Sequence, residues 1–250
     1  MTTLPIALAV GGLDPSGAAG ILMDTKVFQH FGVHNAGIIT AQTVQNSCGV
    51  KDWKPTDSVL FSSQLEAIRE DFTVGVIKVG MLALSEFLEN IIDTFGDAPL
   101  IVDPVMFSKN GKPLVDNPDV YLSFAEEIFL ITPNVPEAKY LASSSSEDPL
   151  VLAKELKRLG FRNVLVKGGH SEGQRVRDVL LMEDGTLRVF SRPRVDKKPR
   201  GTGCAFASAI AANYLIFQDL EKAALRAEEF IGEAIKNSQK LGRCYEVLIF

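Results

Sequence analysis

Apolar runs of strand length alternate with segments of helical spacing along almost all of the 250 residues. Strands that are apolar on both faces and separated by helices are typical of parallel sheets that helices cover on both sides. The expected strands lie at 4–10, 36–44, 74–79, 100–105, 129–134 and 163–166. The sequence therefore predicts an α/β fold, a three-layer αβα sandwich with a mostly parallel central sheet.

The connections refine this expectation. Asp184-Gly185 separates the apolar runs 178–182 and 186–192, and this dipeptide favours a tight hairpin turn, so one antiparallel pair is expected near an edge of the sheet. The small and polar residues 143–149 are typical of a surface connection. Because we find no internal repeat and no domain boundary, the sequence predicts a single domain spanning residues 1–250.

Composition narrows the class of protein. The net charge of −5 and the absence of a long basic run argue against a nucleic-acid partner. No apolar stretch approaches the ~20 residues that span a membrane. The N-terminal apolar run has no basic segment before it and ends in Gly-Gly, which favours a strand over a signal peptide. Cys48, Cys204 and Cys244 share no metal-ligand spacing, so they are expected to be reduced thiols in a cytoplasmic protein.

Gly201-Thr202-Gly203-Cys204-Ala205 opens a long run of small and apolar residues that predicts a buried helix. The two glycines allow a ligand to approach the backbone closely. Unpaired N–H groups and the positive end of the helix dipole would face that ligand, and phosphate is a common occupant of such a place. The same field favours the thiolate form of Cys204, although a buried small residue is the plainer alternative. The segment predicts a phosphoryl-transfer site.

Polar and small residues follow the expected strands, where ligands bind in open α/β sheets. The glycine-rich segment 11–20 lacks the pattern of a Walker loop, so it is either an ordinary turn or a close approach to a small ligand. Asp103 ends a strand, and Glu137 could reach the same space from its own loop. Carboxylates beside phosphate oxygens require a cation such as Mg²⁺. Lys167 could place its charge on a transferring phosphate, or it could be a surface lysine.

Seven segments of this chain, in order and spacing, resemble the hydroxymethylpyrimidine and phosphomethylpyrimidine kinases of thiamine biosynthesis, which belong to the ribokinase-like superfamily. The resemblance covers roughly residues 6–235. The segments are ALAVGGLDPSGAAGILMDTKVF, ITAQTVQNSCGV, KVGML, VDPVM, ITPNVPEA, VKGGH and GTGCAFASAIAA.

The resemblance implies a kinase with ATP and Mg²⁺ as cosubstrates, often a homodimer, that phosphorylates the pyrimidine's hydroxymethyl group and then the resulting monophosphate. It also implies roles for individual residues. The pyrimidine-binding residues would be Gly12, Asp24, Gln45, Met81 and Val105. The nucleotide side would comprise Asn134, Lys167 and Gly168, with Asp103 and Glu137 near the metal. Gly201, Thr202 and Gly203 would form the anion hole, and Cys204 would be the catalytic residue.

The chain departs from the family pattern in four places. Gln45 replaces a common glutamate, Ala18 a glycine, Arg200 a histidine and Glu228 a lysine near the nucleotide. Two alternatives therefore stay open: a pyridoxal or pyridoxine kinase, whose acceptor is also an aromatic ring with a hydroxymethyl group, and a non-catalytic protein that senses the pyrimidine. A sugar kinase is less favoured, because cysteine stands where its motif has aspartate.

Overall fold

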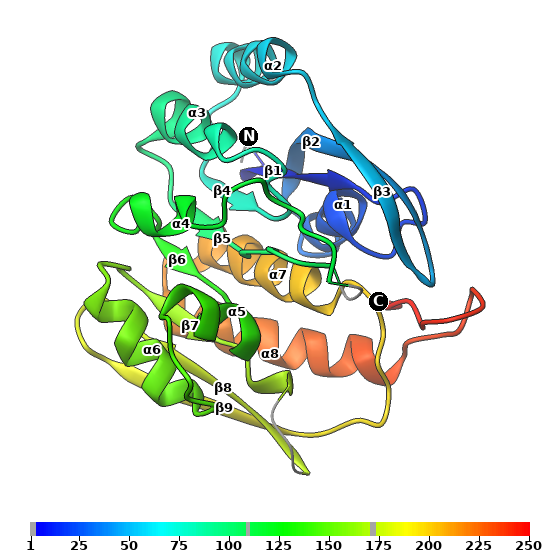
Figure 1. The fold of residues 1–250 in the computed structure, drawn as a ribbon, viewed down its shortest axis with the longest axis vertical. Coiled ribbons are helices and arrows are strands. Elements are labelled where there is room, and N and C mark those ends of the chain that lie inside the picture. The colour runs from blue at the N-terminus through cyan, green and yellow to red at the C-terminus, as the bar shows by residue number, and fades with distance from the viewer. Residues whose placement is uncertain (1–3, 109–110, 171–173) are drawn as a thin grey trace.

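The computed structural model describes residues 4–108, 111–170 and 174–250. These residues form nine strands in one sheet, in the order β3-β2-β1-β4-β5-β6-β7-β8-β9 (Figure 1). The strands are β1 (Ile6–Leu13), β2 (His34–Asn46), β3 (Gly49–Pro55), β4 (Val76–Val79), β5 (Leu100–Val102), β6 (Leu130–Ile131), β7 (Val164–Val166), β8 (Arg175–Leu181) and β9 (Leu187–Pro193). The six strands from β2 to β7 in this order are parallel, which confirms the mostly parallel sheet.

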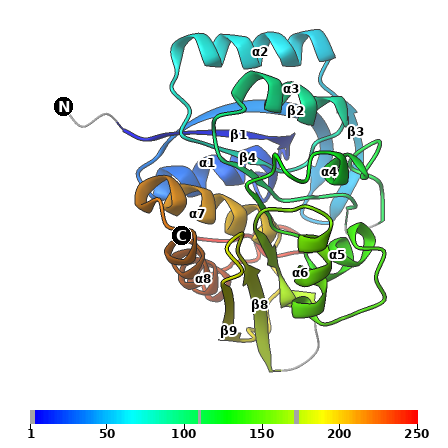
Figure 2. The same ribbon diagram turned by 90° about the vertical axis from the view of Figure 1, so that its left-hand side faces the viewer.

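Helices cover both faces of this sheet (Figure 2). They are α1 (Gly20–His30), α2 (Ser58–Asp71), α3 (Glu86–Phe95), α4 (Val120–Ser123), α5 (Val135–Leu141), α6 (Pro149–Arg158), α7 (Thr202–Phe217) and α8 (Leu220–Lys236), with a 3₁₀ turn at Gly168–His170. No helix in the described ranges has the length and apolar character that crossing a bilayer requires.

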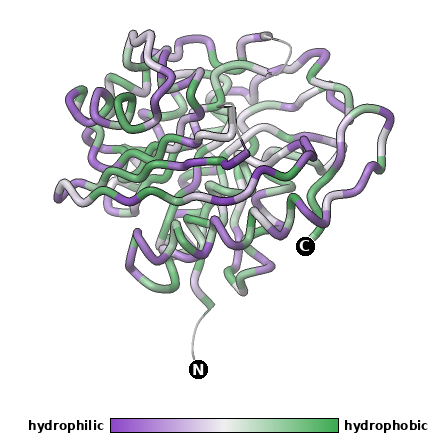
Figure 3. The backbone as a smooth tube through the Cα atoms, turned by 90° about the horizontal axis from the view of Figure 1, so that it is seen from below, coloured by the Kyte–Doolittle hydropathy of each residue, from purple (hydrophilic) through white to green (hydrophobic). Residues whose placement is uncertain are grey.

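Side chains that point alternately to the two faces of the sheet explain the three layers. Leu8 and Val10 of β1 pack in the core shared with α2 to α6, whereas Ala7 and Ala9 pack against α1, α7 and α8. Successive side chains of a strand point to opposite faces, so a strand buried on both sides must be apolar throughout. Figure 3 shows the result as hydrophobic strands in the middle of the molecule. The predicted αβα sandwich is confirmed.

Three elements were not predicted from the sequence. The edge strand β3 contains three charged residues among its seven and forms an antiparallel hairpin with β2, so the sheet has antiparallel pairs at both edges. Helix α5 is short, and it begins where Asn134 and Glu137 form a capping box. Helix α8 buries one alanine-rich face, and Asp219 caps it by accepting a hydrogen bond from the backbone of Lys222.

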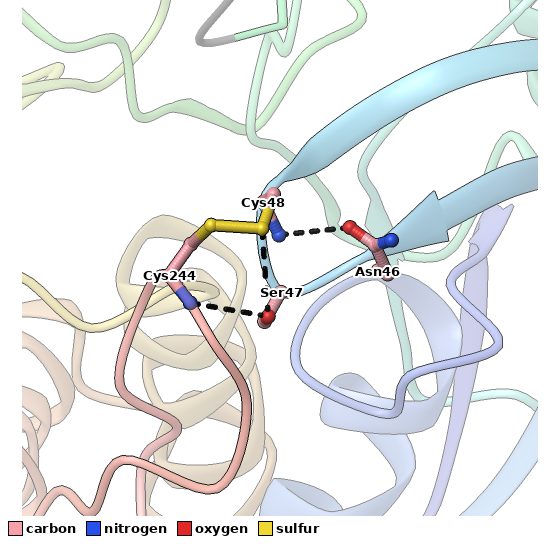
Figure 4. Close-up of a disulfide and its surroundings, with 4 residues drawn as sticks. All are labelled: Asn46, Ser47, Cys48 and Cys244. Atoms are coloured by element: carbon pink, nitrogen blue, oxygen red, sulfur yellow. Dashed lines mark hydrogen bonds between the residues drawn. A yellow bond between two sulfur atoms is a disulfide. The ribbon is translucent and has the colours of Figure 1, made fainter.

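The expectation of three reduced thiols is wrong for two of them. Cys48, in the turn between β2 and β3, forms a disulfide with Cys244 in the C-terminal tail (Figure 4). The backbone N–H of Cys244 donates to the Ser47 hydroxyl at 3.5 Å in the same contact. The two cysteines are 196 residues apart, so no local spacing could reveal the pairing. Cys204 is the remaining free thiol.

We expect this disulfide to stabilise the fold by about 2–4 kcal/mol, because it restricts the unfolded chain over a very long loop. Urea unfolding with and without a dithiol reductant should show that difference. In the C48S/C244S variant the reductant should have no effect, which controls for its action elsewhere. Equal stability of the oxidised and reduced protein would contradict the prediction.

Candidate active site

The start of α7 lies against the loop that precedes α1. Gly201, the N-cap residue of α7, has a φ of 76°, and a Cβ there would lie 2.0 Å from the Ala18 carbonyl oxygen. Gly20 has a φ of 59°, and its Cβ would lie 2.2 Å from the Gly12 carbonyl oxygen. At each of these two positions only glycine fits, because any other residue would bring a Cβ against the backbone. The N–H groups of the first turn, Thr202 to Cys204, have no partner within the helix, so this turn can cradle an anion.

Cys204 lies in that first turn and is half-buried. Burial raises the pKa of its thiol to about 11, although the charge of Lys78 and a hydrogen bond from the backbone of Gly20 both lower it. The charges of Asp24 and Asp103 raise it further. Desolvation therefore outweighs the field of the helix terminus, and it favours the thiol of Cys204 over the thiolate that the sequence predicted.

Lys167 and Asp103 form an ion pair at 2.5 Å between Nζ and Oδ1, and their side chains are 13% and 3% exposed. A Cβ on Gly203 would lie 3.4 Å from both Asp103 Oδ2 and Lys167 Nζ, so the pair lies directly against the anion cradle. Burial alone would lower the pKa of Lys167, but Asp103 and Glu137 outweigh that effect and raise it. Lys167 is therefore a charged group at the site rather than a surface lysine.

Glu137 belongs to helix α5 and not to a loop as expected. Its backbone N–H donates to Asn134 Oδ1 at 2.9 Å, and its Oε2 accepts from the Asn134 N–H at 2.8 Å. Burial raises the pKa of Glu137 to about 7, while Lys167 lowers it and Asp103 raises it. The effect of Asp103 on Glu137 indicates that these two carboxyl groups lie in one region, and their shared role at a metal stays a prediction.

One buried network was not predicted. Lys78 donates to both carboxylate oxygens of Asp24, at 2.8 and 2.9 Å, and Ser208 of α7 donates to Asp24 Oδ1 at 2.8 Å. Both members of the ion pair are fully buried. A lysine inside the apolar strand VIKV was the available signal, since a buried charge needs a partner. Asp24 thus links α1, β4 and α7, and its expected contact with a pyrimidine stays a prediction.

A small apolar cluster packs against the β2–β3 hairpin. Met81 belongs to this cluster with Val50 and Leu114, and Trp53 and Val105 pack against it. The backbone of Met81 is fixed by a 2.6 Å hydrogen bond from the Thr40 hydroxyl to its carbonyl oxygen.

The predicted pyrimidine residues meet at this cluster only in part. A Cβ on Gly12 would lie 2.8 Å from the Met81 sulfur, so these two residues are in contact, and Val105 joins the same cluster. Gln45 is the next-to-last residue of strand β2, where its side-chain oxygen accepts a hydrogen bond from the Thr43 hydroxyl at 3.3 Å.

The nucleotide-side residues are neighbours in space. Asn134 and Lys167 pair as an isolated parallel bridge, and the Gly168 N–H donates to Asp178 Oδ1 at 2.6 Å. Asp178 in turn contacts Arg192, whose Nε lies 3.3 Å from Glu228 Oε2. Burial and, to a smaller extent, the charge of Asp178 raise the pKa of Glu228 to about 9. Glu228 is therefore mostly protonated at neutral pH, so residue 228 lacks the lysine's positive charge without adding a negative one.

A hollow of about 500 Å³ lies at the opposite end of the strands, before the amino ends of β4 and β5. Its lining includes Arg69, Gly75, Asp93 and Pro99. None of the predicted site residues contributes to it. The chemistry-bearing groups gather instead at the carboxyl ends of the strands, as expected for an open α/β sheet.

Comparisons with known proteins identify the family of this chain. The phosphomethylpyrimidine kinase family matches residues 14–248. A hydroxymethylpyrimidine/phosphomethylpyrimidine kinase of Aquifex aeolicus is 42% identical, over 98% of this chain and all of that protein. The crystal structure of a phosphomethylpyrimidine kinase from Clostridium difficile superimposes with a TM-score of 0.79 at 29% identity, over 93% of this chain and all of that chain.

A pyridoxal kinase of Bacillus subtilis, in complex with ADP, is also similar in structure. Its TM-score is 0.85 at 27% identity, over 98% of this chain and 97% of that chain. The match over nearly the whole sequence, together with the glycine-bounded anion cradle beside Cys204, Lys167 and Asp103, leads to one conclusion. The chain belongs to the phosphomethylpyrimidine kinase family.

Proposed function

We propose that the protein transfers the γ-phosphoryl group of ATP to the hydroxymethyl group of the thiamine pyrimidine, and then a second phosphoryl group to the monophosphate. One observation carries this proposal: Cys204 lies in the first turn of α7, and the Lys167–Asp103 pair lies against the same turn at Gly203. A proton acceptor, an anion cradle and a charged lysine are the groups that phosphoryl transfer needs in one place.

Each part of the site has a distinct task in this mechanism. The thiolate of Cys204 accepts the proton of the acceptor hydroxyl as its oxygen attacks phosphorus. The N–H groups of the first turn of α7 and the Lys167 ammonium stabilise negative charge on the transferring group. The apolar cluster around Met81 and Val105 would lie along the pyrimidine ring, and Gln45 would bind its polar edge, while Asp24 supports the site from within the core. Positioning of the two substrates contributes much of the acceleration.

Asp103 and Glu137 fit a magnesium ion. Both are carboxylates, the ligand type that Mg²⁺ prefers, and within the described ranges no group of three or more acidic, histidine or cysteine side chains forms a dedicated metal cage. Two carboxylates leave positions for phosphate oxygens and water, which is how Mg²⁺ is commonly bound in kinases. The ion, when bound, would supply positive charge to the phosphate oxygens.

The pKa of Glu137 gives a test of this site. Because the pKa is raised to about 7, most Glu137 is protonated at pH 6, and a cation must displace that proton. We expect Mg²⁺ to bind about tenfold more weakly at pH 6 than at pH 8, with proton release measurable by calorimetry in two buffers. E137Q keeps the capping box and should lose the pH dependence. Equal proton release from both proteins would contradict the assignment.

The proposed function is tested by offering Mg-ATP with three acceptors in separate coupled assays. Phosphorylation of both hydroxymethylpyrimidine and its monophosphate is the expected result. The similarity to pyridoxal kinases makes pyridoxal the second candidate, and transfer to pyridoxal alone would favour it. Pyrimidine binding without transfer to any acceptor would favour a sensing protein instead.

We further propose that the protein is a cytoplasmic homodimer, as the family resemblance implies. The disulfide bears on this location, because disulfides are rare in cytosolic proteins apart from those of hyperthermophiles. Counting free thiols in protein alkylated during cell lysis distinguishes one thiol, with the disulfide intact, from three. Sedimentation at several protein concentrations reports the oligomeric state.

A further inference from the structure

Three buried cations lie on the elements around the start of α7, and one of them has no anion. Lys78 is paired with Asp24, and Lys167 with Asp103. Arg200 is only 8% exposed. Among the described residues it forms no ion pair, and its Nε and Nη1 atoms are buried without a hydrogen-bond partner. Arg200 therefore differs from both lysines in lacking a carboxylate.

This arrangement is electrostatically unfavourable as it stands. Burying a charged group is costly unless it is paired, and most buried polar side chains have partners. Arg200 also directly precedes Gly201, the N-cap of α7, where the helix dipole places positive charge. A cation beside the positive end of a helix gains stability when an anion binds to both. Phosphate suits this place, because its oxygens accept charge-assisted hydrogen bonds from a guanidinium.

The C-terminal tail holds Arg200 in position. The Arg200 N–H donates to the Glu246 carbonyl oxygen at 2.9 Å, and Arg200 pairs with Val247 as a parallel bridge. The guanidinium carbon lies 5.9 Å from the centre of the Tyr245 ring. Cys244 of the same tail is joined to Cys48 by the disulfide. Packing against the tail buries the arginine, and none of these contacts gives its Nε and Nη1 atoms a hydrogen-bond partner.

We propose that Arg200 binds a phosphate group of a substrate beside the amide cradle of α7. The phosphate can come from two sources, the γ-phosphoryl group of ATP or the phosphate of the monophosphate acceptor. The inference rests on the proposed kinase function. It adds to that function a residue that binds phosphate and directly precedes the anion cradle in the chain. Because the C-terminal tail positions this residue, the tail also contributes to substrate binding.

The test compares R200M, which removes the guanidinium but keeps the length of the stem, with R200K, which keeps the charge but loses the planar fork. R188M is the matched control, because Arg188 forms an exposed ion pair with Glu221 on the surface. Binding is followed first as the rise in thermal unfolding midpoint caused by inorganic phosphate and pyrophosphate. This measurement does not depend on which acceptor the enzyme uses. Kinetics with hydroxymethylpyrimidine and with its monophosphate follow.

We expect R200M to weaken phosphate binding, measured as a smaller stabilisation by inorganic phosphate, and to lower kcat/KM by about 10- to 100-fold, the size of a lost charged hydrogen bond. R200K should retain part of both, and R188M all of both. A decrease confined to the monophosphate acceptor identifies the acceptor's phosphate, and a decrease with both acceptors identifies the nucleotide. Without ligand, R200M should unfold at or above the wild-type temperature, because it removes an unpaired buried charge.

Wild-type phosphate binding and wild-type kinetics in R200M would overturn the proposal. So would a large loss of stability in ligand-free R200M together with unchanged phosphate binding, which would mark the arginine as structural. Should the wild-type protein phosphorylate none of the acceptors, the phosphate-binding comparison still decides the role of Arg200, while the proposed kinase function fails separately.

Discussion

Replacement of Cys204 by alanine is expected to reduce kcat by about 100- to 10,000-fold, the range that a positioned general base contributes. The KM for ATP should change little, because the N–H groups of the α7 cradle belong to the backbone. Because the pKa of the thiol is raised to about 11, only a small fraction is thiolate at neutral pH. The kcat/KM of the wild-type protein should therefore increase about tenfold per pH unit between pH 7 and 9. C204A should show no such increase.

The serine and aspartate variants at residue 204 sharpen this test. C204S keeps the size of the side chain but lacks a group that ionises in this range, so it should be as slow as C204A. C204D supplies a carboxylate base, and it should recover part of the activity with a less steep pH profile. The disulfide leaves Cys204 as the free thiol, so its alkylation can be measured alone. C204A with more than a third of wild-type activity would remove the general-base assignment.

K78M is expected to destabilise the fold by about 3–5 kcal/mol, because it leaves the carboxylate of Asp24 buried without a counter-charge. Burial already raises the pKa of Asp24, and loss of Lys78 removes the largest effect that lowers it. The cost should therefore be smaller at pH 5 than at pH 8: the penalty grows as pH rises above the unfolded-state pKa of Asp24, and the folded protein tolerates the protonated form better. Urea unfolding at the two pH values measures both effects.

The double variant D24N/K78M is the control for K78M. It removes both charges, so it should recover much of the lost stability and lose the pH dependence. N213A offers a second comparison for the loss of stability. Asn213 is a buried polar residue of α7, the helix of Ser208, but it lies outside the Asp24–Lys78 network. Wild-type stability of K78M at pH 8 would show that the ion pair contributes nothing to the fold.

The features that the sequence predicted are those with a local pattern. Apolar strands and the Asp184-Gly185 turn predicted the sheet and the β8–β9 hairpin, because these depend on neighbouring residues. The Gly201–Cys204 segment predicted the start of α7, since glycine spacing and an alanine-rich run are themselves local. The edge strand β3 had no such pattern: three of its seven residues are charged, and pairing with β2 makes it a strand.

The amino-acid sequence by itself determined the layered α/β architecture and the place of the anion cradle, because periodicity and glycine positions act over a few residues. Tertiary structure alone decided the charge state of the site. Burial of Cys204 outweighs the helix field on its pKa, Asp24 is joined to Lys78 across 54 residues, and Cys48 meets Cys244 at the far end of the chain. Arg200 lacks a counter-charge for the same reason. Desolvation and pairing depend on which distant groups the fold brings together, and no local pattern records them.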